Sequence, residues 1–397
     1  MKIVIAHNRY QILGGEDSVV NNELELLRRS GHEVELYERN NDHIVSVYEK
    51  VSVAINVNYS KKSKKDFKQF LLEVMPDIVH VHNFFPALTP SIYDACMELS
   101  IPVIQTIHNY RISCAAATFL RQGQVCEKCM LGSPYNAVRY KCYKDSRIGS
   151  LAVARMIDVH RKNNTWNKKV SFFIALTKFS KKKVVEIGVD KEKILIKPNF
   201  VHKGDCSEIE FKDRNEVVFV GRISEDKGIN IILTAWKKLD IPLTMIGSGP
   251  LLNDVVEENN PNILALGQLS KNDVAAHIKK ARFLIMASTW YEGFPMVLVE
   301  AMRAGIPVIV PKLGSMMEIV SEFETGLHFV PGNSLELAEK VETLYGNPKL
   351  CEEMGSKARQ EYLNRYTPEA NYLMLMYIYG KAIDSVRSAK LRSVGEQ

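Results

Sequence analysis

The chain of 397 residues has no long apolar run. No stretch approaches the roughly 18 consecutive apolar residues that can cross a bilayer, which excludes a membrane-spanning helix. The apolar start, from Met1 to His7, is too short for a signal peptide. We therefore expect a cytoplasmic protein whose seven cysteines are reduced.

Two familiar motifs are also absent. No Asp-x-Asp occurs in the chain, so the carboxylate pair that usually holds a divalent cation on a sugar-diphosphate is missing and no catalytic divalent metal is expected. The segment that begins at Gly247 has Gly249 but no third glycine, as G-x-G-x-x-G would require. A nicotinamide-dependent dehydrogenase is therefore a poor interpretation.

The composition is that of a globular protein, with 46% hydrophobic and 25% charged residues. The length suits two domains of roughly 190 residues each. The formal charge of +6 is unevenly spread, because residues 101–185 hold 16 basic and 3 acidic residues. Such a field attracts phosphates, anionic lipid or nucleic acid, although a basic face can also be merely solvated. A non-enzymatic nucleic-acid-binding protein is thus one alternative.

Short β-branched runs alternate with helical patterns, which is typical of parallel α/β units. Five strands are predicted in each half of the chain, which gives an α/β fold with two doubly wound, Rossmann-like sheets. The expected strands are Lys2–Ala6, Glu33–Tyr37, Ile78–Val81, Val103–Ile107, Phe172–Leu176, Val217–Val220, Leu243–Ile246, Ile263–Leu266, Phe283–Met286 and Pro307–Val310.

The domain boundary is expected at the proline that follows Lys197. We predict an N-terminal Rossmann-like domain over residues 1–197, a C-terminal Rossmann-like domain over 198–367, and a helical tail over 368–397 that crosses back to the first domain. The expected helices are Glu16–Arg29, Gly228–Lys238, Lys271–Lys280 and Met296–Ala304.

Two cations follow the first strand of the second half. Gly221 and Arg222 come directly after Val220, and Lys227 precedes the next helix. A guanidinium and an ammonium near a helix N-terminus can hold a diphosphate. The position after a strand favours this interpretation over two solvated surface cations.

A pair of glutamates, eight positions apart, follows a later strand. Glu292 lies in a loop, where it is free to reach hydroxyls of a transferred sugar. Glu300 lies in an apolar helical run, where a bare charge would be costly and a ribose diol could satisfy it. The helix start between them can receive an anion through its free amides; its residues are Gly293, Phe294, Pro295, Met296 and Val297.

In the first half, glycines and histidines follow strands. Gly14 and Gly15 permit close approach of the backbone to a ligand, although two glycines can simply form a turn. His108 comes directly after the strand Val103–Ile107, which favours a role in the site over a structural one. His82 is a weaker candidate for the acceptor site.

The Glu-x7-Glu element, the Gly221-Arg222 and Lys227 element and the Gly14-Gly15 pair together resemble retaining glycosyltransferases of family four. The likeness runs through nearly the whole chain. It implies the GT-B fold, in which two Rossmann-like domains face a central cleft, and a role in bacterial cell-surface polysaccharide biosynthesis, such as lipopolysaccharide or capsule. A sugar-nucleotide 2-epimerase of the same fold is an alternative that Glu-x7-Glu disfavours.

The resemblance implies that residues 1–197 form an acceptor-binding domain and residues 198–367 a nucleotide-sugar-binding domain. It also assigns roles to the candidate residues. Arg222 and Lys227 would neutralise the donor diphosphate, Glu292 and His108 would contact the sugar, and Glu300 would hold the ribose. The base would lie near Leu266 and Gly267, held by backbone atoms. The donor is expected to be a UDP-sugar, with GDP-mannose as the alternative, and transfer would retain the anomeric configuration.

A cysteine-containing insert occupies residues 112–145. Its four cysteines have the spacing C-x11-C-x2-C-x12-C, which is a pattern for a structural zinc site. A redox pair or unlinked thiols are together an equally good interpretation. They are Cys114, Cys126, Cys129 and Cys142.

The basic stretch and the aromatic run Asn83–Leu88 lie near this insert. Exposed aromatics beside cations would suit the inner face of an anionic membrane, although the run can equally be buried core. We therefore expect a glycan or polyprenyl-diphosphate-linked acceptor and no nucleic acid.

Overall fold

The computed structural model describes residues 1–9, 14–41, 46–204, 211 and 214–395. Its contacts divide the chain into two compact units. Unit 1 contains residues 1–119, 126–198 and 371–397, and unit 2 contains residues 120–125 and 199–370. The main boundary therefore falls within the segment from Lys197 to Phe200.

Unit 1 is built on a six-stranded parallel sheet of order β2-β1-β3-β4-β7-β8. Every residue of β3 and β4 is buried, as expected for parallel strands that are covered on both faces. The strands are β1 (Lys2–Arg9), β2 (Glu33–Asn40), β3 (Ile78–Asn83), β4 (Val103–Ile107), β7 (Phe172–Ala175) and β8 (Ile194–Ile196).

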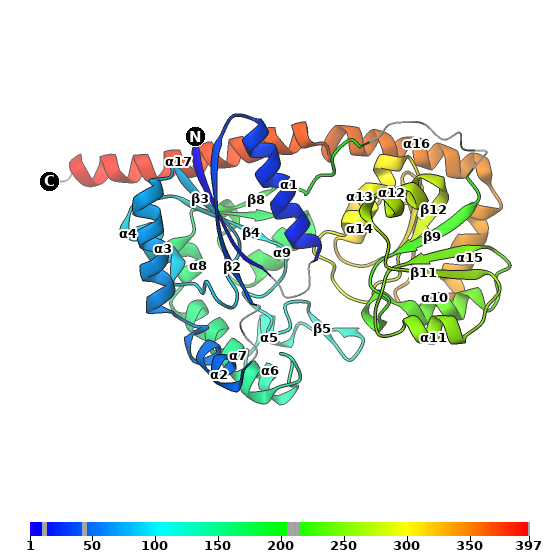
Figure 1. Ribbon diagram of the computed structural model, residues 1–397, viewed down its shortest axis with the longest axis horizontal. Coiled ribbons are helices and arrows are strands. Elements are labelled where there is room, and N and C mark those ends of the chain that lie inside the picture. Colours follow the sequence, from blue (N-terminus) through cyan, green and yellow to red (C-terminus); the bar gives the residue numbers. More distant parts are fainter. Residues whose placement is uncertain (10–13, 42–45, 205–210, 212–213, 396–397) are drawn as a thin grey trace. The chain divides into compact units, whose positions relative to one another are not determined.

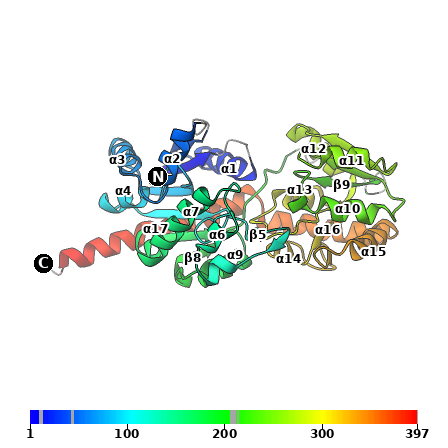
Figure 2. The ribbon, with the colours of Figure 1, turned by 90° about the horizontal axis from the view of Figure 1, so that it is seen from below.

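The helices of unit 1 connect these strands (Figure 1). α6, which lies in the insert, packs against α7, which follows the insert, and the two helices lie close together in Figures 1 and 2. The helices are α1 (Gly15–Arg29), α2 (Val47–Asn56), α3 (Lys61–Val74), α4 (Ile92–Glu98), α5 (Lys128–Leu131), α6 (Asn136–Arg139), α7 (Arg147–Lys162), α8 (Thr165–Lys169) and α9 (Lys178–Glu186).

The C-terminal helix α17 (Pro368–Gly395) belongs to unit 1 from Asn371 onward. Two of its tyrosines bond to histidines of the unit: the hydroxyl of Tyr372 lies 2.9 Å from Nε2 of His32, and that of Tyr379 lies 2.8 Å from Nδ1 of His80. The last helix thus contributes to the interior of the first unit.

Unit 2 also has a six-stranded parallel sheet, of order β11-β10-β9-β12-β13-β14. Numbered within the unit, this order is 3-2-1-4-5-6, that of dinucleotide-binding folds. The strands are β9 (Glu216–Val220), β10 (Leu243–Ile246), β11 (Ile263–Gly267), β12 (Ala281–Ile285), β13 (Val308–Pro311) and β14 (Gly326–Phe329).

The helices of unit 2 bury a second hydrophobic core centred on Trp236 and Phe283. α12 and α13 have the bounds that the sequence predicts. The helices are α10 (Ile229–Trp236), α11 (Leu252–Glu257), α12 (Lys271–Lys280), α13 (Met296–Ala304), α14 (Met316–Ile319), α15 (Ser334–Tyr345) and α16 (Pro348–Arg365), with the short 3-10 helix η3 (Glu225–Lys227) before α10.

The prediction of five strands in each sheet is wrong by one strand in each. β8 is only three residues long and lies between Lys193 and Lys197, so its apolar run is hidden among charges. β14 starts with a glycine and contains His328, which weakens its strand pattern. The predicted fold class itself is confirmed, with two doubly wound parallel sheets.

Candidate active site

In unit 2, the strand order reverses between β9 and β12, and this is where ligands of doubly wound sheets bind. Gly221 and Arg222 follow β9, and the loop that holds Glu292 follows β12. Gly228 joins the two segments: it has φ +73°, and a Cβ there would lie 2.0 Å from the carbonyl oxygen of Ala287. Only glycine allows this close approach.

Lys227 and Glu292 are in direct contact at this position. The Lys227 ammonium donates to Oε1 of Glu292 at 2.6 Å, and Oγ of Ser288 donates to the same oxygen at 2.6 Å. The side chains of Lys227 and Glu292 are 19% and 7% exposed. Glu292 is therefore anchored, whereas the sequence suggested a glutamate free in a loop; its Oε2 has no hydrogen-bond partner among the described residues.

Trp290, which sequence reasoning missed, lies beside this pair. The Lys227 ammonium is 5.3 Å from the centre of its ring. The indole nitrogen Nε1 is buried and has no partner within the described part of the chain. Because buried donors are nearly always satisfied, an unpaired indole N–H beside a cation indicates a place for a ligand. A tryptophan in the loop after a strand was the available signal.

Arg222 lies on the same short connection but is more open. Its side chain is 63% exposed; Nη2 is 3.1 Å from both carboxylate oxygens of Asp226, and Nε is 3.2 Å from Oγ of Ser224. The Asp226 carbonyl accepts a bond from the amide of Thr289 at 3.0 Å, which ties the connection to the loop after β12. An incoming diphosphate could replace Asp226 as the partner of Arg222.

Glu300 projects from α13, which begins after Pro295. Burial raises the pKa of Glu300, against the opposing effect of Arg303 and Lys271. A half-buried carboxylate without a hydrogen-bond partner among the described residues is suited to accept hydroxyl donors. Among the described residues, no hydrogen bond or ion pair joins it to Lys227 or Glu292.

The other predicted donor-site residues lie at helix and strand ends. Phe294 is buried, and Met296 and Val297 form the first turn of α13. Gly267 ends β11 with φ +68°, and its carbonyl accepts from the amide of Gly247 at 2.8 Å. Whether a base binds beside Leu266 stays a prediction.

In unit 1, the strand order reverses between β1 and β3. At the end of β1, Nε2 of His7 lies 3.0 Å from Oδ1 of Asp17, and Oδ2 of Asp17 accepts from the amide of Gly14 at 2.8 Å. Gly14 precedes α1 and Gly15 begins it, with open space where a Cβ would lie. Sequence reasoning missed His7 and Asp17, although an acid in the first turn of a helix is a capping signal.

His82 and His108 are brought together. Nδ1 of His82 lies 2.9 Å from Nε2 of His108, and their rings are stacked at 5.1 Å. On its other side, Nε2 of His82 lies 3.3 Å from Oε2 of Glu23. Burial lowers the pKa of His108 well below its ordinary value, and the charge of His82 acts in the same direction, so the ring is neutral.

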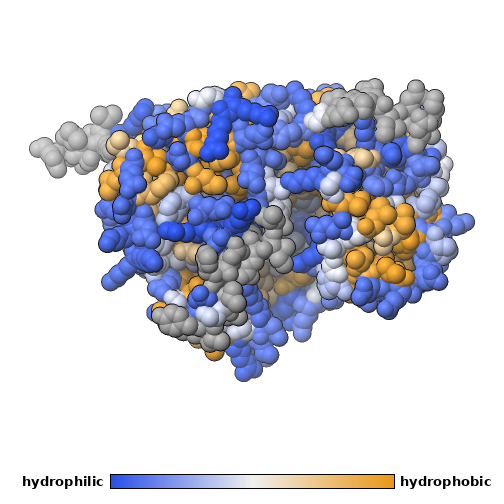
Figure 3. All heavy atoms as spheres, in the orientation of Figure 1, coloured by the Kyte–Doolittle hydropathy of each residue, from blue (hydrophilic) through white to orange (hydrophobic). Residues whose placement is uncertain are grey.

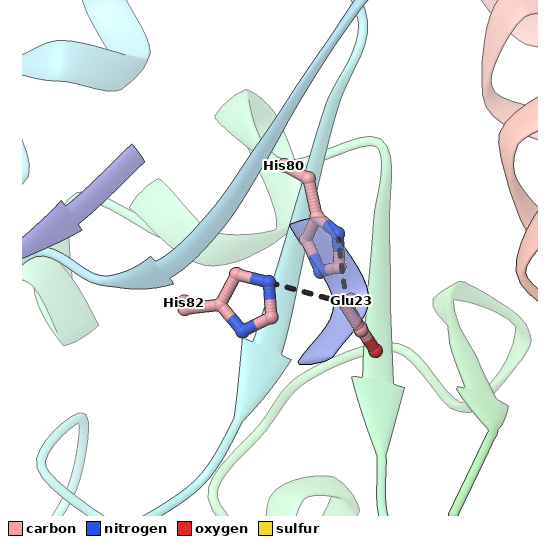
Figure 4. Close-up of side chains that lie close together, drawn as sticks. All are labelled: Glu23, His80 and His82. Atoms are coloured by element: carbon pink, nitrogen blue, oxygen red, sulfur yellow. Dashed lines mark ion pairs between the residues drawn. The ribbon is translucent and has the colours of Figure 1, made fainter. Parts of the chain in front are cut away.

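Glu23, His80 and His82 place three potential metal ligands within 4.8 Å (Figure 4). Two of these residues already have other partners, however. Lys197 donates to Oε1 of Glu23, and the nitrogens of His80 lie 2.8 Å from the Tyr379 hydroxyl and 2.7 Å from Oγ1 of Thr106. A buried ammonium at the carboxylate would repel a cation, so this cluster fits a polar network better than a metal.

The charge state of Glu23 follows from its partners. Burial alone would raise its pKa, but the Lys197 ammonium, and after it His82 and His80, hold the pKa well below its ordinary value. The carboxylate is therefore ionised and accepts hydrogen bonds only.

The four cysteines of the insert influence one another electrostatically. Burial raises the pKa of Cys129 to about 12, and the thiols of Cys114, Cys142 and Cys126 add to this. Within the described ranges, the cluster of Glu23, His80 and His82 is the one group whose three ligand atoms meet within 4.8 Å, so the thiols are less tightly gathered than a loaded zinc site.

The aromatic run expected at a membrane face is instead core. Phe84, Phe85 and Leu88 are buried in the hydrophobic core of unit 1, where the ring of Phe84 contacts those of Tyr93 and Trp166. Figure 3 shows a face on which hydrophilic residues predominate and hydrophobic ones form smaller patches. Leu131 in the insert and Ile148, at the start of the following helix α7, are both 76% exposed.

Comparisons with known proteins agree with this geometry. Residues 13–203 match the family model "Glycosyltransferase Family 4", and residues 206–361 match "Glycosyl transferases group 1". An uncharacterized glycosyltransferase of Methanocaldococcus jannaschii is 33% identical over 176 residues, which are 43% of this chain and 50% of that protein. The capsular polysaccharide biosynthesis glycosyltransferase CapM of Staphylococcus aureus is 27% identical over 178 residues, 42% of this chain and 46% of CapM.

Solved structures share the fold over nearly the whole chain. Anabaena HepE in complex with UDP has a TM-score of 0.66 at 17% identity, covering 98% of this chain and 100% of that one. The matched segment spans about half the length of the two curated relatives above. No helix among the described residues is long and apolar enough to cross a membrane. Because the two domain models follow each other along the chain, the protein belongs to the family 4 glycosyltransferases with the GT-B fold.

Proposed function

We propose that this chain transfers a sugar from a nucleotide-sugar to a glycan or lipid-linked acceptor in cell-surface polysaccharide biosynthesis. The expected donor is a UDP-sugar, and GDP-mannose is the alternative. The observation that carries the proposal is the contact between Lys227 and Glu292 at the reversal point of the unit 2 sheet. HepE, which has the same fold, is described in complex with UDP, and CapM is named for capsular polysaccharide biosynthesis.

The chemistry divides among a few side chains. Lys227 and Arg222 neutralise the departing diphosphate, and the amides at the start of α13 assist them. Glu292, held by Lys227 and Ser288, orients the transferred sugar through its second oxygen. Glu300 accepts the ribose hydroxyls.

We propose transfer with retention, in which the leaving group itself acts as the base. A double-displacement route needs a nucleophilic carboxylate close to the anomeric carbon. In unit 1, the carboxylates near the reversal point already have partners: Asp17 bonds His7 and the amide of Gly14, Glu16 accepts from Nδ2 of Asn109 at 3.4 Å, and Glu23 bonds Lys197. A same-face reaction, in which the departing phosphate takes the acceptor proton, therefore fits better.

A screen of nucleotide-sugars tests the donor. A preferred donor should raise the melting temperature, and its hydrolysis or transfer should release the nucleoside diphosphate. NMR of the product then reports the anomeric configuration. Failure of every UDP- and GDP-sugar to stabilise or turn over would refute the donor assignment, and inversion would refute the same-face route.

We also propose that the protein contacts the inner face of an anionic membrane. The contact would be made by the exposed side chains of Leu131 and Ile148, near the basic insert. The double variant Leu131→Ser/Ile148→Ser should float with anionic vesicles at least tenfold less than the unaltered chain, since two apolar side chains leave the interface. Leu264→Ser, which removes a 57% exposed leucine of unit 2, is the matched control. Equal flotation of all three proteins would exclude this surface.

A structural zinc ion in the insert is proposed from the four interacting thiols. A divalent cation would relieve the mutual repulsion of the thiolates. Metal analysis should find one zinc per chain, lost in Cys126→Ser/Cys129→Ser and kept in Cys96→Ala. An unaltered chain purified without zinc, and unchanged in stability when zinc is added, would refute the site.

A further inference from the structure

Glu23, His82 and His108 form a line of polar contacts that leads from the interior of unit 1 to the carboxyl edge of its sheet. Glu23 lies on α1, His82 lies on β3, and His108 follows β4. Figure 4 shows the rings of His80 and His82 turned towards the Glu23 carboxylate. The inner end is closed by Lys197, whose ammonium donates to Glu23 and lies 3.3 Å from Oδ1 of Asn371.

The contacts determine where each proton lies. Glu23 is an ionised carboxylate, so the nitrogen that faces it must carry a hydrogen. That nitrogen is Nε2 of His82 at 3.3 Å, a long contact, but neither Nε2 nor Oε2 has a better partner among the described residues. When His82 is neutral, a proton on Nε2 leaves a lone pair on Nδ1.

The same logic extends to the next ring. Because Nδ1 of His82 is an acceptor, Nε2 of His108, 2.9 Å away, must donate to it. The lone pair of His108 is then on Nδ1. Among the described residues Nδ1 has no hydrogen-bond partner, and it is not one of the buried unpaired atoms, so it is accessible.

We propose that Glu23 and His82 are positioning residues that fix His108 as the Nε2–H tautomer, so that His108 presents a hydrogen-bond acceptor to a substrate hydroxyl. The assignment of the tautomer is independent of the reaction, whereas the role of His108 towards a sugar rests on the proposed function. In the opposite tautomer Nδ1 would donate, and a hydroxyl that must donate its own proton would lose its partner.

Nitrogen NMR tests the tautomer directly. In the full chain labelled with ¹⁵N-histidine, two-bond ¹H–¹⁵N spectra at pH 8, where imidazoles are mostly neutral, distinguish the two tautomers. The His108→Gln variant assigns the signal among the ten histidines. His160 is an internal reference, because its Nε2 lies 2.8 Å from the carbonyl of Asn58 and must donate. We expect His82 and His108 to match His160; a His108 in the Nδ1–H form, or averaging between forms, would overturn the proposal.

Glu23→Gln should reverse the whole line. The ammonium of Lys197 can only donate, so it holds the amide oxygen and turns the amide nitrogen towards His82. His82 then becomes the Nδ1–H tautomer, and His108 follows. Tyr379→Phe, which removes a partner of His80 but none of this line, should leave His108 unchanged. A folded Glu23→Gln chain with an unaltered His108 tautomer would contradict the mechanism of control.

Turnover then tests the role. Glu23→Gln should lower kcat/KM about ten- to hundredfold, the effect of one misdirected hydrogen bond, with UDP affinity unchanged. Equal kcat/KM in Glu23→Gln and Tyr379→Phe would remove the positioning role. A lack of any transfer by the unaltered chain would instead sink the proposed function, while the spectra still decide the tautomer.

Discussion

The carboxyl edges of the two sheets have the same kind of topology but opposite electrostatics. In unit 1, burial lowers the pKa of His7, His80 and His108, so neutral rings dominate the edge. In unit 2, Lys227 and Glu292 meet as charged groups at the equivalent reversal of strand order. A doubly wound sheet thus offers a position, and the side chains decide whether it orients neutral hydroxyls or binds phosphate.

The difference extends to rigidity. In unit 1, Glu23, His80 and His82 are buried, and their network reaches the last helix through Tyr379. In unit 2, Arg222 is 63% exposed, and the indole nitrogen of Trp290 lacks a partner among the described residues. Unsatisfied and exposed polar groups are what an incoming ligand completes, so we expect the unit 2 edge to respond most strongly to donor.

Removal of the Lys227 ammonium should have the largest effect on catalysis at the carboxyl edge of the unit 2 sheet, which we call the charged edge. Lys227→Ala loses the diphosphate partner and leaves buried Glu292 without its cation, so we expect kcat to fall by about 10²–10³-fold. Lys237→Ala removes a 58% exposed lysine of the same unit and is the control. Steady-state kinetics with the preferred donor decide it, and a loss below about fivefold would show that the phosphate is neutralised elsewhere.

Gly228 should be the most sensitive backbone position of this edge. Gly228→Ala costs about 1 kcal/mol for its positive φ, and the added Cβ would lie 2.0 Å from the Ala287 carbonyl oxygen. The forced shift costs roughly another 1–3 kcal/mol. Gly332→Ala, with φ +84° and open space, isolates the first contribution. Urea unfolding of both variants should differ; equal midpoints would mean that the two segments are not tightly packed.

Glu300→Gln and Glu292→Gln, both at the charged edge, should affect donor binding in different ways. Loss of the charged acceptor for the ribose should weaken every nucleotide-sugar alike, by about tenfold or more, because bonds to charged groups contribute roughly 1.5–3 kcal/mol. Glu292→Gln should instead change the choice among sugars. Calorimetric titration with one nucleoside diphosphate and its different sugars separates the two, and sugar-dependent weakening by Glu300→Gln would reverse our assignment.

At the carboxyl edge of the unit 1 sheet, the loss of a carboxylate should affect stability rather than phosphate binding. Asp17→Asn can keep only part of the two bonds to His7 and the Gly14 amide. We expect a loss of about 1–2 kcal/mol of stability, as for other N-terminal helix caps. UDP affinity should be unchanged. A parallel fall in UDP affinity would show that the two edges are not separate in function.

Sequence patterns predicted the elements where periodicity is strong. α12 and α13 have their expected bounds, and Arg222, Lys227 and Glu292 follow strands as predicted. The failures have local causes. β8 is short and flanked by lysines, and the aromatic run beginning at Phe84 could be read equally as surface or core.

The buried network around Glu23 in unit 1 could not be predicted from the sequence. Lys197 and Glu23 are 174 positions apart, and a fully buried lysine is contrary to expectation for its residue type. Only the fold brings the pair together with His82. Similarly, the anchoring of Glu292 by Lys227 depends on the turn at Gly228, whose requirement for glycine appears only when Ala287 lies against it.

The charged carboxylate of Glu300 should lower the stability of the folded chain slightly, although it strengthens donor binding. Burial raises its pKa above the ordinary value of 4.5, so in the window between the two values the folded chain binds more protons than the unfolded chain. Stability therefore falls as pH rises through that window, and the cost persists at neutral pH. Glu300→Gln should raise Tm by the order of 1–2 °C at pH 7 and not at pH 4, where both states are protonated. The exposed Glu324→Gln is the control. Because the same substitution weakens donor binding, a lower Tm at pH 7 in the absence of donor would mean that the folded protein stabilises the charged carboxylate, and that the ribose is not needed to satisfy it.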